Sequence, residues 1–171
     1  MSNNTAMTLL RNLYQSGHGW LEGTVQGVTA EVAHWQPPGR SLPIAAEYAH
    51  VVFSEDALFA QMLANKPPMF MSTPSGASEP PPPGNWNDWS RRVQLDLDVA
   101  HAYAQQVYAA TDAYLAACND DVLGQPCDLS SIGMEMQTKA VLIGLLLQNI
   151  HNHAGEISCL KGLQGLQGYP A

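Results

Sequence analysis

The chain ends in an apolar segment that carries the sequence HNHAGEI at residues 151–157. The residues just before it, 140–147, are almost wholly apolar, which predicts a helix that faces a hydrophobic core. With about 3.6 residues per turn, Asn149, His153 and either Glu156 or the isoleucine after it share one face. A histidine on a core-facing helix needs a partner, so His153 is either a metal ligand or a buried histidine bonded to a carbonyl or carboxylate.

His151 lies two residues before His153, which places it about 200° away around a regular helix. The two histidines therefore point the same way only if a bulge interrupts the helix between them. Without such a bulge, only one of them is available as a ligand on the core-facing side.

Charge limits the classes of partner. The formal net charge is −8, from 15 acidic and 7 basic residues in a chain of 171. This charge opposes phosphate binding over long range, and the basic residues form no stripe that would overrule it. We therefore expect no nucleic-acid partner.

The N-terminal residues, the hydropathy and the cysteines bear on the cellular compartment. The first residues lack the pattern of a signal peptide, and no segment reaches the uncharged length of a membrane span. Three cysteines without a C-x-x-C pair indicate free thiols. We expect a cytoplasmic protein with no membrane segment.

Apolar residues recur at three- and four-residue steps, as in amphipathic helices. The predicted helices span residues 5–27, 41–64 with Ser41 as N-cap, 87–118, and a last helix that ends at Gly162, with a short helical turn at 28–35. The region 65–86 is rich in proline and reads as a loop over one end of the core. We predict an all-α four-helix bundle that forms one domain, residues 1–171.

Two other histidines, His50 and His18, lie on the predicted helices away from the centre of the apolar stripe. His50 lies on the flank of the second helix, in a polar line with Glu47, Ser54 and Gln61. The pair Glu47 and His50 has the Glu-x-x-His spacing of di-iron carboxylate bundles, but that site needs a second such motif, which the chain lacks. His18 is predicted to be a solvated surface residue.

Three stretches, in this order, resemble the DinB-like superfamily. They are VTAEVAHWQPPG at residues 28–39, a serine-started helix that carries His50, and HAGEI at 153–157 followed by Lys-Gly at 161–162. The superfamily includes bacillithiol and mycothiol transferases and maleylpyruvate isomerase-like enzymes. The resemblance implies an up-down-down-up four-helix bundle, often a homodimer.

The resemblance also implies a divalent metal, such as zinc, nickel or iron, held at one end of the core. By position its ligands are His50, His153 and Asn149, where the family usually has a histidine in place of the asparagine. A neutral amide oxygen is a poorer ligand than an imidazole nitrogen. Three alternatives follow: Asn149 completes a weak site with waters, His151 substitutes after a bulge, or the site survives as a polar pocket without metal.

The implied function is that of a metal-dependent enzyme. It would move a low-molecular-weight thiol onto a small electrophilic substrate, or act as a related isomerase or hydrolase, with Glu156 orienting ligands or moving protons. The alternative is a non-catalytic dimeric bundle with a degenerate metal site that binds a small molecule. A purely structural or interaction protein is a third hypothesis.

Overall fold

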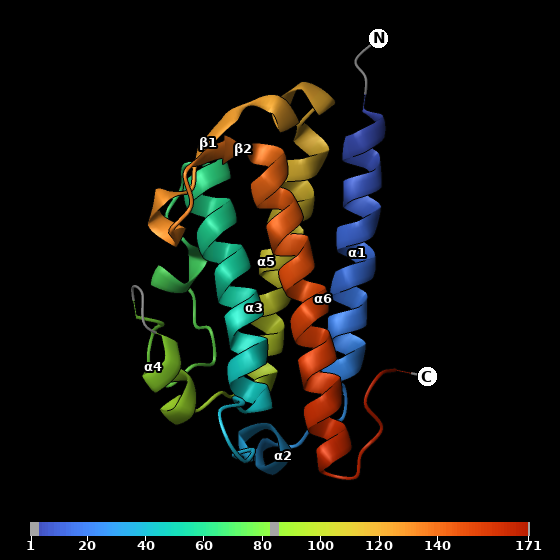
Figure 1. Ribbon diagram of the computed structural model, residues 1–171, viewed down its shortest axis with the longest axis vertical. Helices are drawn as coiled ribbons and strands as arrows, with labels where there is room; N and C mark the ends of the chain where they lie inside the picture. The colour runs from blue at the N-terminus through green and yellow to red at the C-terminus, as the bar shows by residue number, and fades with distance from the viewer. Residues whose placement is uncertain (1–3, 83–85, 171) are drawn as a thin grey trace.

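The computed structural model describes residues 4–82 and 86–170. Its four long helices are α1 (Thr5–Val25), α3 (Ile44–Leu58), α5 (Leu97–Ala117) and α6 (Lys139–Leu163). In Figure 1, α1 and α6 run downward, whereas α3 and α5 run upward. The predicted four-helix bundle with up-down-down-up order is therefore confirmed.

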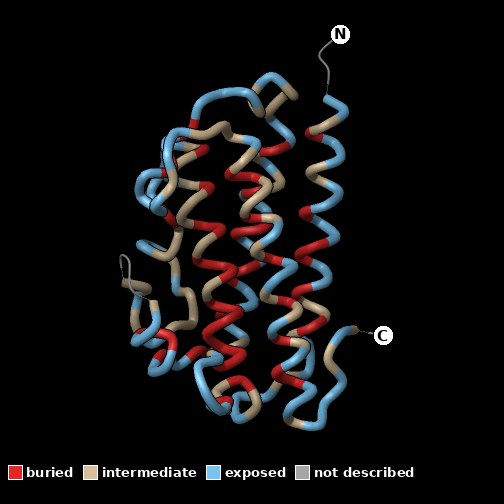
Figure 2. The backbone as a smooth tube through the Cα atoms, in the orientation of Figure 1, coloured by how far each residue is buried: buried red, intermediate tan, exposed pale blue. Residues whose placement is uncertain are grey.

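Each long helix packs against two others. Both α1 and α3 contact α5 and α6, so α1 and α3 lie on one diagonal of the bundle and α5 and α6 on the other. The buried residues lie on the faces that the four helices turn toward one another (Figure 2). Consequently α3 and α6 are antiparallel neighbours over their whole length, which decides how their side chains meet.

Short elements join the long helices. They are α2 (Ala30–His34), the π-helical turn η1 (Phe59–Leu63), the 3-10 turns η2 (Met69–Met71), η3 (Asp120–Gly124) and η4 (Ser130–Ile132), α4 (Trp86–Arg92), and the strands β1 (Pro126–Asp128) and β2 (Met136–Thr138). The side chain of Thr29 caps α2 by accepting a hydrogen bond from the backbone N–H of Val32 at 3.3 Å. The strands pair antiparallel, with Cys127 opposite Gln137.

Several predicted boundaries are wrong. The helix predicted over 87–118 is divided into α4 and α5, because Asp96 caps a new start by accepting hydrogen bonds from the backbone N–H groups of Asp98 and Val99. The second long helix begins at Ile44 after Pro43, not at Ser41. The β1–β2 hairpin lies between the third and the last predicted helix, where no strand was predicted.

The last helix ends one residue beyond the predicted stop. It extends to Leu163, and Gly165, with φ of 76°, is the residue that adopts the left-handed conformation after it. Within the described residues, no helix has both the length and the hydropathy that a membrane span requires.

His18 is buried, so its predicted surface position is wrong. It is 7% exposed, and its Nε2 lies 2.9 Å from Oε2 of Glu55, which is 1% exposed. The hydroxyl of Thr111 donates to Oε1 of the same carboxylate at 2.6 Å. A polar network thus connects α1, α3 and α5 through the centre of the core.

Gly76 anchors the proline-rich segment to the start of α5. Its carbonyl accepts a hydrogen bond from the backbone N–H of Asp96 at 2.8 Å, and its φ is +80°. A Cβ at this position would lie 2.5 Å from the carbonyl oxygen of Asp96 and 2.8 Å from the backbone nitrogen of Ala100. The position therefore needs glycine both for its conformation and for space.

We expect Gly76→Ala to lower the free energy of unfolding by about 3 kcal/mol, through left-handed strain and the backbone clash together. Gly133→Ala is the matched control, because Gly133 has φ of +78° but an added Cβ would meet nothing within 4 Å. It should cost about 1–2 kcal/mol. Urea unfolding measures both variants, and equal losses would show that the contact with Asp96 carries no cost.

Candidate functional site

Two glutamate–histidine pairs face each other across α3 and α6. Glu47 and His50 lie three residues apart on α3, and His153 and Glu156 lie three residues apart on α6 in the opposite order. Because the two helices are antiparallel, the reversed order brings histidine beside histidine and both glutamates to one side. The rings of His50 and His153 are edge-to-face, with centroids 4.8 Å apart.

The Nδ1 atom of His153 lies between two carboxylates. It is 2.8 Å from Oε2 of Glu47 and 2.5 Å from Oε2 of Glu156. Both contacts are ion pairs when His153 is protonated, although neither meets the geometric criteria of a hydrogen bond. An imidazole nitrogen and two carboxylate oxygens held this close together favour a shared cation, either a proton on His153 or a metal ion.

The donor atoms of Glu47, His153 and Glu156 all lie within 4.8 Å of one another. An imidazole nitrogen and two carboxylate oxygens are a donor set that binds divalent metals. The side chains are 9%, 18% and 55% exposed, respectively, so the cluster opens to solvent on the Glu156 side. The described residues therefore fit a metal with positions left for other ligands.

The electrostatics of the two histidines differ. Burial, together with the neighbouring His153, lowers the pKa of His50 to about 4, although Glu47 and a hydrogen bond with Asn149 oppose this shift. Burial also lowers the pKa of His153, but the carboxylates of Glu47 and Glu156 outweigh it and raise that pKa above its usual value. His50 is thus neutral at pH 7, and the negative field at His153 favours a cation.

The structure brings the sequence-predicted ligands together only in part. His50 and His153 are in contact, and Asn149 lies beside His50 with its amide hydrogen-bonded to the ring. The three-residue cluster of histidine and acidic donors, however, consists of Glu47, His153 and Glu156 and does not include His50. Sequence reasoning missed Glu47 as a candidate metal donor, although the Glu-x-x-His spacing had marked it.

His151 does not replace Asn149. The α-helix α6 is continuous from Lys139 to Leu163, so no bulge turns His151 toward the core. Its side chain is instead exposed and lies against α1, where a Cβ on Gly17 would be 3.4 Å from its Nε2.

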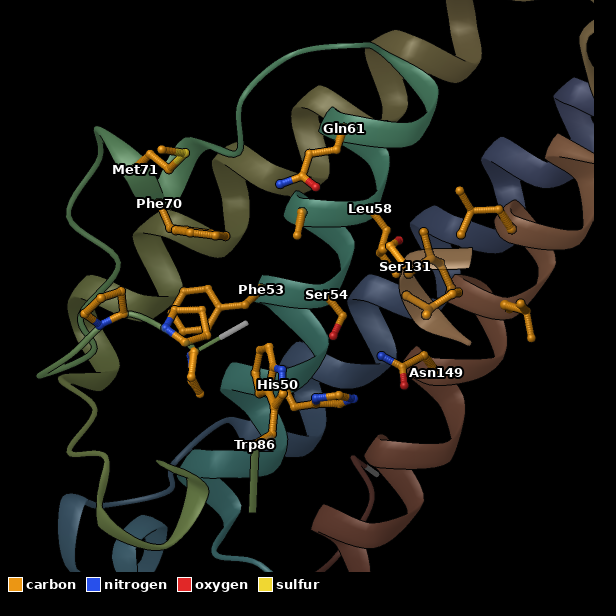
Figure 3. A pocket seen from close by; sticks show the side chains of 18 of the residues that line it. His50, Phe53, Ser54, Leu58, Gln61, Phe70, Met71, Trp86, Ser131 and Asn149 are labelled. Atoms are coloured by element: carbon orange, nitrogen blue, oxygen red, sulfur yellow. The ribbon is translucent and has the colours of Figure 1, made fainter. Parts of the chain in front are cut away.

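A cavity of about 1060 Å³ begins at His50 and Asn149 and extends between α3 and α6 (Figure 3). Parts of the predicted proline-rich loop form one of its walls, through Phe70, residues 80–82 and Trp86. The edge of the Trp86 ring system packs against His50, with ring centroids 5.0 Å apart. Residues 83–85 of that loop lie outside the described residues.

Fold and site together define a four-helix-bundle protein with a candidate metal centre between two antiparallel helices. The family model of the DinB superfamily matches residues 17–157, and the chain belongs to this superfamily. A crystal structure described as the conserved protein of locus from Enterococcus faecalis has the same fold, with a TM-score of 0.76 and 16% sequence identity. The similarity covers 90% of this chain and 94% of that one. No curated protein matches the chain.

Proposed function

We propose that the protein is a metal-dependent enzyme whose metal is held by Glu47, His153 and Glu156, with His50 beside them as a further ligand. One observation carries the proposal: the donor atoms of Glu47, His153 and Glu156 all lie within 4.8 Å of one another. Membership of a metal-associated superfamily supports it. Zinc, nickel and iron all accept imidazole and carboxylate ligands.

The proposed reaction is the transfer of a low-molecular-weight thiol to an electrophile, or a related hydrolysis or isomerisation. When bound, a divalent metal here would lower the pKa of a thiol or of water and so provide a nucleophile near neutral pH. Glu156 is the most exposed of the three donors and one helical turn from His153, so it can take up the proton that the nucleophile loses. In a thiol transfer, a bond forms between sulfur and the electrophile while the leaving group departs, and Glu156 returns the proton to that group.

A second candidate is a small-molecule-binding bundle without catalysis. Asn149 favours it, because the hydrogen bond between its amide and His50 engages a ring that would otherwise be a ligand. A homodimer remains a prediction under both functions, and exposed apolar side chains on α1, namely Leu9, Leu13 and Trp20, offer a surface for it.

The test is the metal content of tag-free protein, measured by mass spectrometry, followed by titration of metal affinity. We expect His153→Ala and Glu47→Gln each to weaken affinity by at least about 100-fold, because the first removes a donor atom and the second replaces a charged carboxylate with a neutral amide, which is a poorer ligand. The controls His151→Ala and Glu31→Gln change the same residue types at exposed positions outside the cluster and should retain the metal. Full metal content in both cluster variants would show that the ligand assignment is wrong.

Two further variants separate the candidate functions. His50→Ala should weaken metal affinity, and Asn149→His should strengthen it by supplying a second imidazole from α6. If the native protein binds no metal while the Asn149→His variant does, the result would favour the non-catalytic bundle.

A further inference from the structure

The cavity beside the candidate metal centre is lined by uncharged groups. Among the described residues of its wall there is no lysine, arginine, aspartate or glutamate. Most of the wall is aromatic or aliphatic, including Phe53, Leu58, Trp86, Leu142 and Leu145. A ligand that fills this space exchanges water for apolar surface.

Three polar groups of the cavity form a row along one helix face, and two others, Asn149 and Ser131, lie on α6 and η4. His50, Ser54 and Gln61 are spaced by four and seven residues, so they follow one another along one side of α3 and its continuation η1 (Figure 3). With a rise of about 1.5 Å per residue, His50 and Gln61 are about 16 Å apart. Hydrogen-bonding groups thus lie at both ends of a long apolar space.

The charges nearby argue against an anionic occupant. The ionisable group in contact with His50 is His153, which itself lies between the carboxylates of Glu47 and Glu156. An anion in this apolar wall loses its hydration, and no described residue of the wall is a lysine or arginine that would compensate for the loss. A charged low-molecular-weight thiol therefore does not fit this cavity, whereas a neutral molecule does.

We infer that the cavity binds an elongated, uncharged, largely apolar molecule, with one polar group at His50 and Asn149 and a second at Gln61. This inference rests on the proposed function for the role of that molecule, which is the electrophile rather than the thiol. The volume of about 1060 Å³ suits a molecule of drug-like size. Its reacting group would lie at the His50 end, beside His153.

The first test compares two probes that share one ring system. N-phenyl-1-naphthylamine is uncharged, and 1-anilinonaphthalene-8-sulfonate carries an added sulfonate; both fluoresce in apolar surroundings. We expect the neutral probe to bind at least about tenfold more tightly than the sulfonate, equivalent to about 1.4 kcal/mol. Equal binding, or tighter binding of the sulfonate, would overturn the inference.

A pair of alanine variants locates the probe. Ala57 lines this cavity, whereas Ala60 lines a separate apolar cavity of about 690 Å³ between η1 and α5 that also includes Lys66. Ala57→Phe should weaken binding of the neutral probe by at least about tenfold, and Ala60→Phe should change it by less than about twofold. The reverse pattern would place the probe in the second cavity and overturn the assignment.

A second test addresses the two polar ends. 1,12-Dodecanediol and 1-dodecanol compete with the neutral probe, and they differ by one terminal hydroxyl. Gln61→Leu should weaken binding of the diol by about fivefold, which corresponds to the loss of one hydrogen bond. Binding of the alcohol should not change. Equal effects on both would show that Gln61 does not bind a polar group. Gln61 is exposed, so this variant tests the inference even if Ala57→Phe folds poorly.

None of these binding experiments needs the metal. Probe binding that follows the expected pattern in protein without metal would support the cavity assignment even if the metal proposal failed. Conversely, protein that holds metal at Glu47 and His153 but prefers the sulfonate would retain the proposed centre and lose the inferred substrate class.

Discussion

His18→Leu is expected to lower the free energy of unfolding by about 3–5 kcal/mol, because it leaves the buried carboxyl group of Glu55 without its imidazole partner. Glu55 is 1% exposed, and His18 lies 2.9 Å from one of its carboxylate oxygens while Thr111 donates to the other. In the variant, the carboxylate stays in the core, with an apolar side chain in place of the imidazole. Urea unfolding at neutral pH measures the loss.

The double variant His18→Leu with Glu55→Gln provides the control. Glutamine has nearly the same shape but no charge, so the double variant should recover part of the stability that the single variant loses. A loss below about 1 kcal/mol in His18→Leu would contradict the interpretation of His18 and Glu55 as a buried pair.

Asp56→Ala is expected to lower the free energy of unfolding by about 3–5 kcal/mol and to detach the segment that contains η2 from the bundle. Asp56 is 3% exposed and accepts three hydrogen bonds, from the backbone N–H of Met69 at 3.0 Å, from that of Phe70 at 3.1 Å, and from the hydroxyl of Tyr103 at 2.5 Å. Alanine leaves all three donors without this acceptor. Urea unfolding and limited proteolysis near residue 70 measure the two effects.

Tyr103→Phe separates the contributions, since it removes one donor and leaves the two backbone hydrogen bonds to Asp56. It should cost about 1 kcal/mol and leave the segment protected from proteolysis. Because Phe70 lines the cavity, Asp56→Ala should also weaken binding of N-phenyl-1-naphthylamine under conditions where the protein is folded. Unchanged protection and unchanged binding would show that Asp56 does not hold this wall.

The long helices were predictable because apolar residues at three- and four-residue steps are a local signal. The division between α4 and α5 was not, because the apolar pattern continues through Val93 and only the capping geometry of Asp96 reveals the break. His18 was misplaced for a different reason. Its partner Glu55 is 37 residues away on another helix, and periodicity does not report which polar residues meet.

The candidate site was also predictable only in part, because sequence spacing does not report which residues of different helices meet. The last helix and the family resemblance placed His153 and Glu156 on the right segment, and the Glu-x-x-His spacing placed Glu47 with His50. The sequence contains no second Glu-x-x-His motif. Its place is taken by His153 and Glu156 in reversed order, which becomes equivalent only when α3 and α6 are known to run antiparallel.

The pairing of α3 with α6 also sets the order of events while the protein is made. Chains are synthesised from the N-terminus, and the two halves of the candidate metal site are about 100 residues apart in sequence. Glu47 and His50 therefore leave the ribosome long before His153 and Glu156 exist. If the cluster binds a metal as proposed, the ion can bind only after the last helix has packed against α3. Metal binding would therefore occur only in chains whose bundle is complete.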